Sequence, residues 1–262
     1  MNLLAIETAT DLVGAAFVAD PARPGHPAAA VQSEPGGRRH AEALAPAIEA
    51  VCARTGHTVR DVDVVAVDNG PGLFTGLRVG VATAKAFGQA LGIGVVAVSS
   101  LDVLAAAALE RWEGTRPVTV VAVVDARRGE VFTAAYRDGG AGRTGDADPA
   151  DLVVAPTDRF DPAALVAGVE RLAAEVAGGP VVVVGDGAAR YRDLLDGIAG
   201  VVLDLLDGEG ALVAPPPGVL AALARARLAR GEQPAPAATV VPDYRREADA
   251  RINWVERRPP ER

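Results

Sequence analysis

The chain has 262 residues, of which 50% are hydrophobic, and carries a formal net charge of -8 at pH 7. This is enough apolar material for one large α/β domain or two smaller ones, so a wholly disordered chain is excluded. The acidic balance argues against an extended nucleic-acid-binding surface, and Cys52 as the only cysteine excludes an internal disulfide or a multi-cysteine zinc site.

The first part of the chain has the pattern of three strands and a helix. Residues 2–8 and 12–19 are short apolar runs around a polar break, which predicts two antiparallel strands, and residues 28–33 follow as a third strand. Apolar residues recur at helical spacing over 39–54, so a helix with one buried face is expected there. Cys52 lies within this pattern, which favours a small core residue over a reactive thiol.

The next segment has the pattern of a strand, a turn, a helix and a second strand. These elements are expected at residues 62–67, 68–72, 75–91 and 94–98. A unit of this length predicts a parallel pair of strands joined by a right-handed crossover. Ser99 or Ser100 is a suitable N-cap for a further helix that ends near Trp112.

The second half repeats this order after a linker at residues 113–117. Strands are expected at 118–124, 130–136, 181–184 and 201–205, and helices at 162–176, 188–195 and 219–230. We therefore predict an α/β protein with two similar lobes, 1–112 and 117–262, in which the helix at 219–230 packs back on the first lobe. A loop at 138–150, rich in Gly and Asp, is expected to be mobile.

The C-terminal tail is locally basic within an acidic protein. From Arg225 onward it contains nine arginines against six acidic residues. A flexible, solvated tail and a docking segment are both compatible with this composition.

The turn at residues 70–76 is rich in glycine and leads directly into a helix. Free amides at such a helix start can bind an anion, although the turn lacks the Lys and Ser/Thr of a P-loop and does not match the dinucleotide fingerprint. The alternative is that the glycines permit a sharp turn where a side chain would clash.

Small residues recur every four positions along the helix that follows, at Gly76, Gly80, Ala84 and Gly88. Each glycine costs roughly 1 kcal/mol relative to alanine in a helix interior, so a close contact must compensate. The helix at 39–54 and another subunit are the two candidates for that contact.

Few side chains in the sequence indicate catalysis. His26, His40 and His57 form no HExxH or HxxxH pair, and no Gly-x-Ser-x-Gly elbow is present, so neither a metal site nor a hydrolase site is predicted. Lys85 is the only lysine among 26 basic residues, which is compatible both with a specific role for its ammonium group and with chance survival.

No apolar run reaches the length of about 20 residues that a membrane-spanning helix needs. The first residues also show no basic leader or cleavage site of an export signal. We therefore expect a cytoplasmic protein that does not bind membranes.

The chain resembles the TsaB (YeaZ) family, whose members act in the threonylcarbamoyl modification of the adenosine next to the tRNA anticodon (t6A). The shared motifs, in chain order, are Ile6–Thr10, Arg39–Glu42, Gly70–Gly80, Val98–Asp102, Asp125–Val131 and Pro242–Arg246. The long glycine motif is specific, and the others are individually weak but span most of the chain. Leu73 departs from the family, which usually has serine there.

The resemblance implies a two-lobed, actin-like and Hsp70-like (ASKHA) nucleotidyl fold, in which each lobe is a mixed sheet with flanking helices. It also implies that the chain is not an enzyme. The related catalytic subunit, TsaD, binds its metal through two histidines four residues apart, and the matching positions here are Ser100 and Leu104. Ala9 stands where nucleotide-binding members of the superfamily use glycine, so no cofactor and no metal are expected.

In the family, the first two helices form the interface with TsaD or with a second TsaB copy, and here they correspond to residues 40–51 and 76–88. The candidate interface residues are His40, Leu44, Gly72, Phe74, Gly76, Leu77, Arg78, Gly80 and Lys85. We expect Gly76 and Gly80 to allow close approach of the partner, and a bulky residue at Gly80 to abolish pairing while the monomer stays folded.

The expected partners are the TsaD catalytic subunit in a heterodimer and the TsaE ATPase in a larger complex, with a homodimer as a further possibility. Contact with tRNA is expected mainly through the complex. Two other functions compete with this scaffold role. A small-molecule kinase of the same superfamily would use an acid such as Glu7 to hold magnesium, and a metallopeptidase would need the missing histidine pair.

Overall fold

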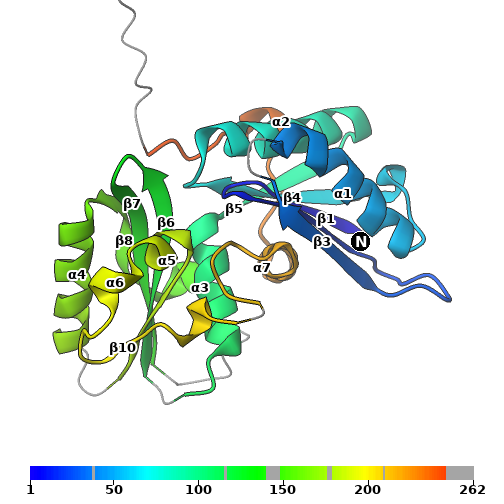
Figure 1. Cartoon of the computed structure of the whole chain (residues 1–262). Coiled ribbons are helices and arrows are strands. Elements are labelled where there is room, and N and C mark those ends of the chain that lie inside the picture. Colours follow the sequence, from blue (N-terminus) through cyan, green and yellow to red (C-terminus); the bar gives the residue numbers. More distant parts are fainter. Residues whose placement is uncertain (37–38, 115–116, 140–147, 176–178, 209, 246–262) are drawn as a thin grey trace, which may run out of the picture.

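The computed structural model describes residues 1–36, 39–114, 117–139, 148–175, 179–208 and 210–245, which form two lobes (Figure 1). Several predicted features lie outside the described residues: Arg246 of the last motif, part of the linker at 113–117, most of the loop at 138–150, and the tail beyond residue 245.

The first lobe is built on a five-stranded sheet with the order β3-β2-β1-β4-β5. Its strands are β1 (Leu3–Glu7), β2 (Leu12–Val18), β3 (Ala29–Pro35), β4 (Val64–Gly70) and β5 (Gly94–Ser99). β2 pairs antiparallel with β1 and β3, whereas β4 pairs parallel with β1 and β5. The predicted hairpin and the predicted parallel pair are both confirmed.

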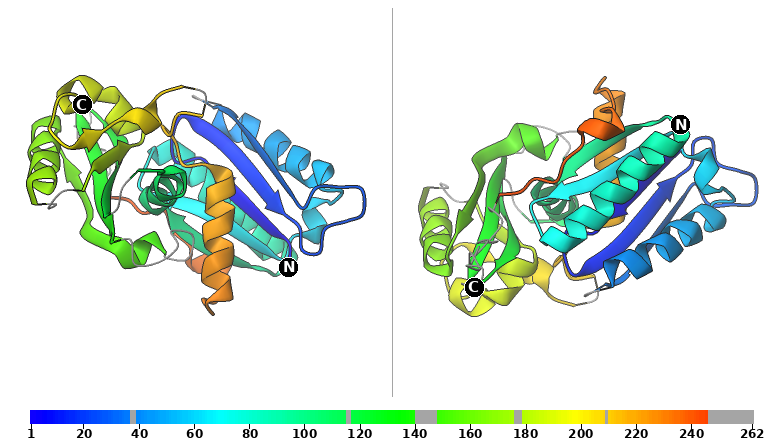
Figure 2. Two further views of the ribbon diagram at one scale, coloured as in Figure 1. Left: turned by 90° about the horizontal axis from the view of Figure 1, so that it is seen from below. Right: turned by 90° about the horizontal axis from the view of Figure 1, so that it is seen from above.

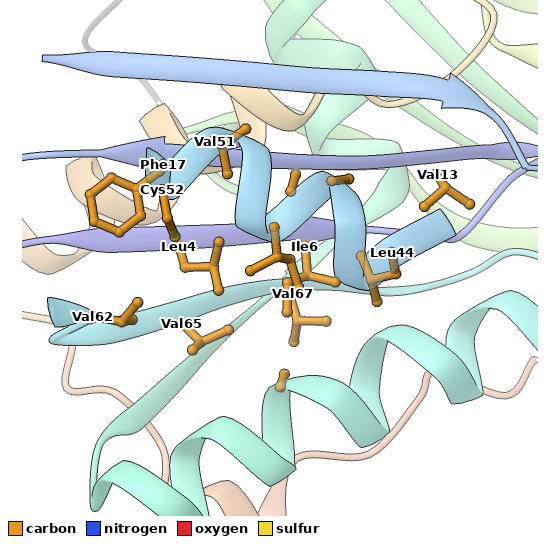
Figure 3. Packing of buried hydrophobic residues seen from close by; sticks show 14 of the residues in the cluster. Leu4, Ile6, Val13, Phe17, Leu44, Val51, Cys52, Val62, Val65 and Val67 are labelled. Carbon is orange, nitrogen blue, oxygen red and sulfur yellow. The ribbon is translucent and has the colours of Figure 1, made fainter. Parts of the chain in front are cut away.

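Helices cover both faces of this sheet. α1 (His40–Arg54) and α2 (Phe74–Leu91) lie side by side on one face (Figure 2). Figure 3 shows Leu4, Ile6 and Leu44 in the core between these helices and the sheet. α7 (Pro217–Ala229) crosses the opposite face, where Leu220 packs with a second set of strand residues. Cys52 is buried in the first of these cores, as the sequence predicted.

The second lobe has the same topology as the first. Its sheet has the order β10-β9-β6-β7-β8, formed by β6 (Val118–Arg127), β7 (Glu130–Asp138), β8 (Val153–Phe160), β9 (Val181–Val184) and β10 (Val201–Val202). β7 pairs antiparallel with β6 and β8, whereas β9 pairs parallel with β6 and β10. The corresponding strands of the first sheet pair in the same directions. This duplicated mixed sheet with flanking helices is the two-lobed α/β fold that the resemblance implied.

The helices of the second lobe are α3, α4, α5 and α6. α3 (Ser100–Arg111) packs on one face of the sheet, and α4 (Pro162–Glu175), α5 (Asp186–Arg190) and α6 (Arg192–Leu195) lie on the other. Short 3-10 helices are η1 (Val59–Asp61), η2 (Pro149–Leu152), η3 (Asp204–Leu206) and η4 (Ala237–Thr239). Among the described helices, none combines the length and the apolar character needed to cross a bilayer.

Three predictions for the second lobe were wrong in detail. β8 was not predicted, because Pro156 and several polar residues interrupt its pattern, as is typical of an edge strand. The helix expected at 188–195 is two short helices divided at Tyr191, whose φ of -108° and ψ of 24° are not helical. The strand expected at 201–205 ends at Val202 and gives way to η3.

Ion pairs connect the two lobes. Arg227 of α7 contacts Asp102 of α3 at 2.8 Å and Asp148 at 2.7 Å, and the hydroxyl of Tyr136 donates to Asp102. All three charged side chains of this group are largely buried, so the contacts fix α7 against the second lobe.

The chain returns to the first lobe after α7. We call residues 232–245 the C-terminal strap. It runs past the free edge of β5, where Val95 and Ala235 exchange backbone hydrogen bonds of 2.9 and 2.8 Å, and continues beside α2 (Figure 1).

Candidate functional site

A groove lies between α1 and α2 on the outer side of the first lobe. It has a volume of ≈ 410 Å³, and its walls are mainly apolar. Ala41, Ala45 and Ala82 are exposed along it, so a partner helix can reach it from solvent. The residues that line the groove are Ala41, Leu44, Ala45, Ile48, Glu49, Val59, Val79, Ala82, Thr83 and Phe87.

The glycine face of α2 points away from this groove. A Cβ at Gly76 would lie 2.0 Å from the carbonyl oxygen of Thr8, and a Cβ at Gly80 would lie 2.3 Å from the Thr8 hydroxyl. The Thr8 hydroxyl occupies that space and donates a 2.8 Å hydrogen bond to the carbonyl of Gly76. The glycines therefore allow α2 to approach β1 of the same lobe.

Two sequence-based expectations need correction on this point. The contact that compensates Gly76 and Gly80 is made chiefly by Thr8 at the end of β1, and not by the helix at 39–54. A bulky residue at Gly80 would collide with Thr8, so it cannot be expected to leave the monomer folded.

Three of the other seven candidate interface residues are buried. His40, Leu44 and Leu77 are at most 4% exposed. A ring nitrogen of His40 lies 2.8 Å from the carbonyl oxygen of Thr10, so His40 fixes the turn between β1 and β2. Of these three residues, only Leu44 lines the groove. Buried residues of this set can influence a partner only through the position of α1 and α2.

The turn before α2 packs tightly on the β1–β2 turn. A Cβ at Gly72 would lie 2.2 Å from the carbonyl oxygen of Ala9, and the amide of Leu73 donates a 2.7 Å hydrogen bond to the same oxygen. Gly70 has a φ of 111°, which favours glycine. These contacts support the structural interpretation of the glycine-rich turn.

Lys85 does not lie at the rim of the groove as a free charge. Its ammonium group donates hydrogen bonds of 3.1 Å to the carbonyl oxygens of Ala238 and Val240 in the C-terminal strap. Lys85, predicted as an interface residue, therefore makes its described contacts within the chain. A compact ammonium with three donors suits two carbonyls at one point better than a forked guanidinium does.

Phe74 and Arg78 form an exposed cluster with Tyr244 of the strap. Phe74 and Tyr244 are each 45% exposed, and their ring centroids are 5.2 Å apart. The Arg78 guanidinium lies 3.9 Å from the centroid of the Phe74 ring, and its Nε donates to the Tyr244 hydroxyl at 3.1 Å. Phe74 and Arg78 are one helical turn apart, and Ala82 of the groove is one turn further on the same ridge.

Two buried acids lie at the ends of β1 and β4. Glu7 and Asp68 are both fully buried, and burial raises the pKa of both carboxyl groups. Glu7 accepts a hydrogen bond from the Ala9 amide, and Asp68 accepts bonds from the Gly70 amide and the Ser100 hydroxyl. Glu7 Oε2 and Asp68 Oδ2 have no hydrogen-bond partner among the described residues, and after burial the negative charge of Asp68 raises the pKa of Glu7 further.

A second acidic pair lies at the matching place in the second lobe. Asp186 accepts a 2.8 Å hydrogen bond from the Asp125 amide, and burial raises the pKa of Asp186 to about 6. Arg127 and Arg190 contact the Asp125 carboxylate at 3.1 and 3.5 Å. Arg127 also pairs with Asp11 of the first lobe at 2.7 Å, so the acids are neutralised within the chain.

The described residues offer no evident place for a metal ion. No group of three or more His, Cys, Asp or Glu among them is arranged to bind one. Ser100 and Leu104, which match the metal ligands of the catalytic relative, are both fully buried. Glu7 does not reach the surface, which weakens its expected role as a magnesium ligand in a kinase.

Sequence reasoning missed most of the groove. Val79, Thr83 and Phe87 line it at a spacing of four residues, on the ridge of α2 next to the glycine ridge. The spacing of this second ridge is a local sequence pattern, so it could have been predicted. The partnership of Tyr244 with Arg78 joins positions 166 residues apart, so no local pattern could reveal it.

Residues 28–254 match the family model of TsaD, tRNA N6-adenosine threonylcarbamoyltransferase. The tRNA threonylcarbamoyladenosine biosynthesis protein TsaB of Bacillus subtilis is 28% identical over 219 residues, which cover 84% of this chain and 85% of the relative. TsaB of Escherichia coli is 31% identical over 137 residues, which cover 52% of this chain and 55% of the relative.

An uncharacterized protein of Mycobacterium tuberculosis is 46% identical over 102 residues, which cover 39% of this chain. The match spans 44% of that relative, so the chain spans about half the length of several curated relatives. Among solved structures, YeaZ from Pseudomonas aeruginosa superposes with a TM-score of 0.70 at 25% identity, over 93% of this chain and 99% of the other.

Proposed function

This chain belongs to the TsaD family, in its TsaB (YeaZ) branch, and from that premise we propose that it is a non-catalytic scaffold subunit of the complex that transfers a threonylcarbamoyl group to adenosine in tRNA. Its α1/α2 face would bind the TsaD catalytic subunit. The observation that carries the proposal is the open apolar groove between these helices, about 410 Å³ in volume.

The groove fits a helical partner. Its lining is almost entirely aliphatic and aromatic, with Glu49 and Thr83 as the only polar residues among the ten that line it. A specific protein interface buries about 800 Å² per partner, and two helices of 15 and 18 residues supply a face of that size. An amphipathic helix of the partner would place its apolar ridge in the groove.

The acidic side chains at the matching ends of the two sheets are held inside the chain. Glu7 and Asp68 are fully buried, and the Asp125 carboxylate is paired with Arg127 and Arg190. A nucleotide or a metal ion could reach these acids only if the surrounding contacts rearranged, which supports the scaffold over the kinase alternative.

We further propose that the complex includes the TsaE ATPase, that two copies of this chain can pair through the same face, and that tRNA is bound mainly by the other subunits. The cytoplasm is the proposed location, as for tRNA modification in general.

Sedimentation of the chain with the TsaD subunit of the same organism tests the proposal. We expect a one-to-one complex that Ala82→Arg abolishes, because the guanidinium would fill the groove. Ala163→Arg is the matched control, since Ala163 is also an exposed helical alanine but lies on α4. If neither the wild-type chain nor the control binds TsaD, and the isolated chain instead binds ATP tightly, the kinase alternative replaces the scaffold.

A further inference from the structure

The C-terminal strap is fastened to the α2 side of the first lobe along its whole length. Backbone hydrogen bonds join Ala235 to Val95, and the amide of Asp243 donates to the carbonyl oxygen of Asn69 at 2.7 Å. The Lys85 ammonium holds the middle of the strap through two carbonyls. Since these anchors lie on β4, β5 and α2, the strap is an integral part of the lobe.

Small residues let the strap lie close to the lobe. A Cβ at Gly88 would lie 2.5 Å from the Cβ of Ala237, and a Cβ at Gly94 would lie 2.4 Å from the Cβ of Pro234. Val240 is 4% exposed and belongs to the core beneath α2. The strap therefore has a fixed position, and its outer side chains are presented in a fixed orientation.

The end of the strap exposes two large hydrophobic side chains. Val241 is 63% exposed and Tyr244 is 45% exposed, and Tyr244 stacks on Phe74, which is also 45% exposed. Aromatic residues and arginine are the residue types that dominate the binding energy of protein interfaces. Here an aromatic residue, Phe74, and an arginine, Arg78, lie next to each other on α2, at the end of the ridge that leads to Ala82 of the groove.

Arg78 lacks an acidic partner in the described part of the chain. Its guanidinium contacts the Phe74 ring and the Tyr244 hydroxyl, and no described carboxylate pairs with it. In contrast, Arg245 is paired with Asp243 at 2.7 Å. An uncompensated guanidinium above an exposed aromatic pair fits a carboxylate on a binding partner.

We propose that the C-terminal strap forms the second wall of the partner-binding face. The protein that occupies the α1/α2 groove also covers the cluster of Phe74, Arg78 and Tyr244, and it presents an acidic residue to Arg78. Lys85 is a positioning residue for this wall, because it holds the strap and does not touch the partner. This inference rests on the proposed function, and it extends the face from two helices to a segment more than 150 residues away in sequence.

Titration calorimetry of the full chain with the TsaD subunit tests the inference. We expect Tyr244→Ala to weaken binding by about tenfold or more, as for an aromatic hot spot, and Lys85→Met to weaken it as well. Leu194→Ala is the matched control, because Leu194 is 50% exposed on α6 of the other lobe and should bind like the wild type. Thermal unfolding of each variant verifies that it is folded.

Hydrogen exchange separates the role of Lys85 from a direct contact. In the free chain, Lys85→Met should speed exchange at the amides of Ala235 and Asp243, whereas Tyr244→Ala should leave the amide of Ala235 protected. Unchanged exchange in Lys85→Met would show that Lys85 does not hold the strap and would overturn its assigned role.

The outcomes distinguish this inference from the proposed function. If the wild-type chain binds TsaD, and Tyr244→Ala and Lys85→Met bind it as tightly as the wild type does, the inference of a second wall is wrong while the groove proposal stands. If the wild-type chain does not bind, both fail. If Tyr244→Ala leaves TsaD binding intact but lowers the affinity of the assembled complex for tRNA, the cluster is an RNA contact and the inference is overturned.

Discussion

At the residue scale, the contact between Thr8 and the glycines of α2 decides how the first lobe packs. Gly76→Ala should lower the free energy of unfolding by about 2 kcal/mol or more, because its Cβ would lie 2.0 Å from a backbone oxygen that cannot move freely. Gly168→Ala is the control, since a Cβ there meets nothing within 4 Å, and it should stabilise α4 by up to about 1 kcal/mol. Urea unfolding of both variants measures the difference, and equal stabilities would contradict the packing described.

Asp186 makes the stability of the second lobe depend on pH. Burial raises its pKa from 3.8 to about 6, while Asp125 adds a like charge and Arg127 opposes it. The folded state holds the proton of Asp186 more tightly than the unfolded state does. The contribution of this proton to the free energy of unfolding is therefore fully present below pH 4 and is lost as the pH rises through 6. The loss is at most about 3 kcal/mol.

The substitution Asp186→Asn removes this titration. We expect denaturant unfolding between pH 4 and pH 7 to show that the free energy of unfolding of the wild type falls, relative to that of the variant, as the pH rises. A difference that stays constant over this range would show that Asp186 titrates normally.

At the scale of elements, α2 begins without a side-chain cap. Its N-cap is Leu73, with φ of -64° and ψ of 119°, a backbone conformation that suits a capping serine. Leu73→Ser should raise the free energy of unfolding by about 1 kcal/mol, because the hydroxyl can accept a hydrogen bond from a free amide of the first turn. Leu73→Ala serves as the comparison in thermal unfolding, and equal melting temperatures for Ser and Ala would contradict the effect.

The elements also show which parts of the fold can be predicted from sequence. The β4–α2–β5 unit was predicted closely because its apolar runs, its glycine turn and the Ser99 cap of α3 all act over a few residues. β8 was not, because Pro156 and polar residues interrupt its pattern, and the position of the strap was not, because its anchors are distant in sequence. For the same reason the glycine ridge was identified correctly but assigned to the wrong contact, since only the tertiary structure brings Thr8 beneath it.

At the scale of the whole molecule, two lobes of equal topology are joined by ion pairs. The duplicated order of elements was predictable from sequence, whereas the ion pairs that join the lobes were not. Phe74 on α2 and Tyr244 on the strap are both exposed, beside the end of the α1/α2 groove. The central claim of the proposed function is that this face binds a partner.

The most direct test of that claim is threonylcarbamoyl transfer to tRNA by the reconstituted complex, with and without this chain. We predict that transfer requires the chain, that Ala82→Arg abolishes the stimulation, and that Asp125→Asn, which changes a buried acid of the second lobe, retains it. Transfer that proceeds equally well without the chain, or that is lost in Asp125→Asn while the complex still assembles, would contradict a scaffold role.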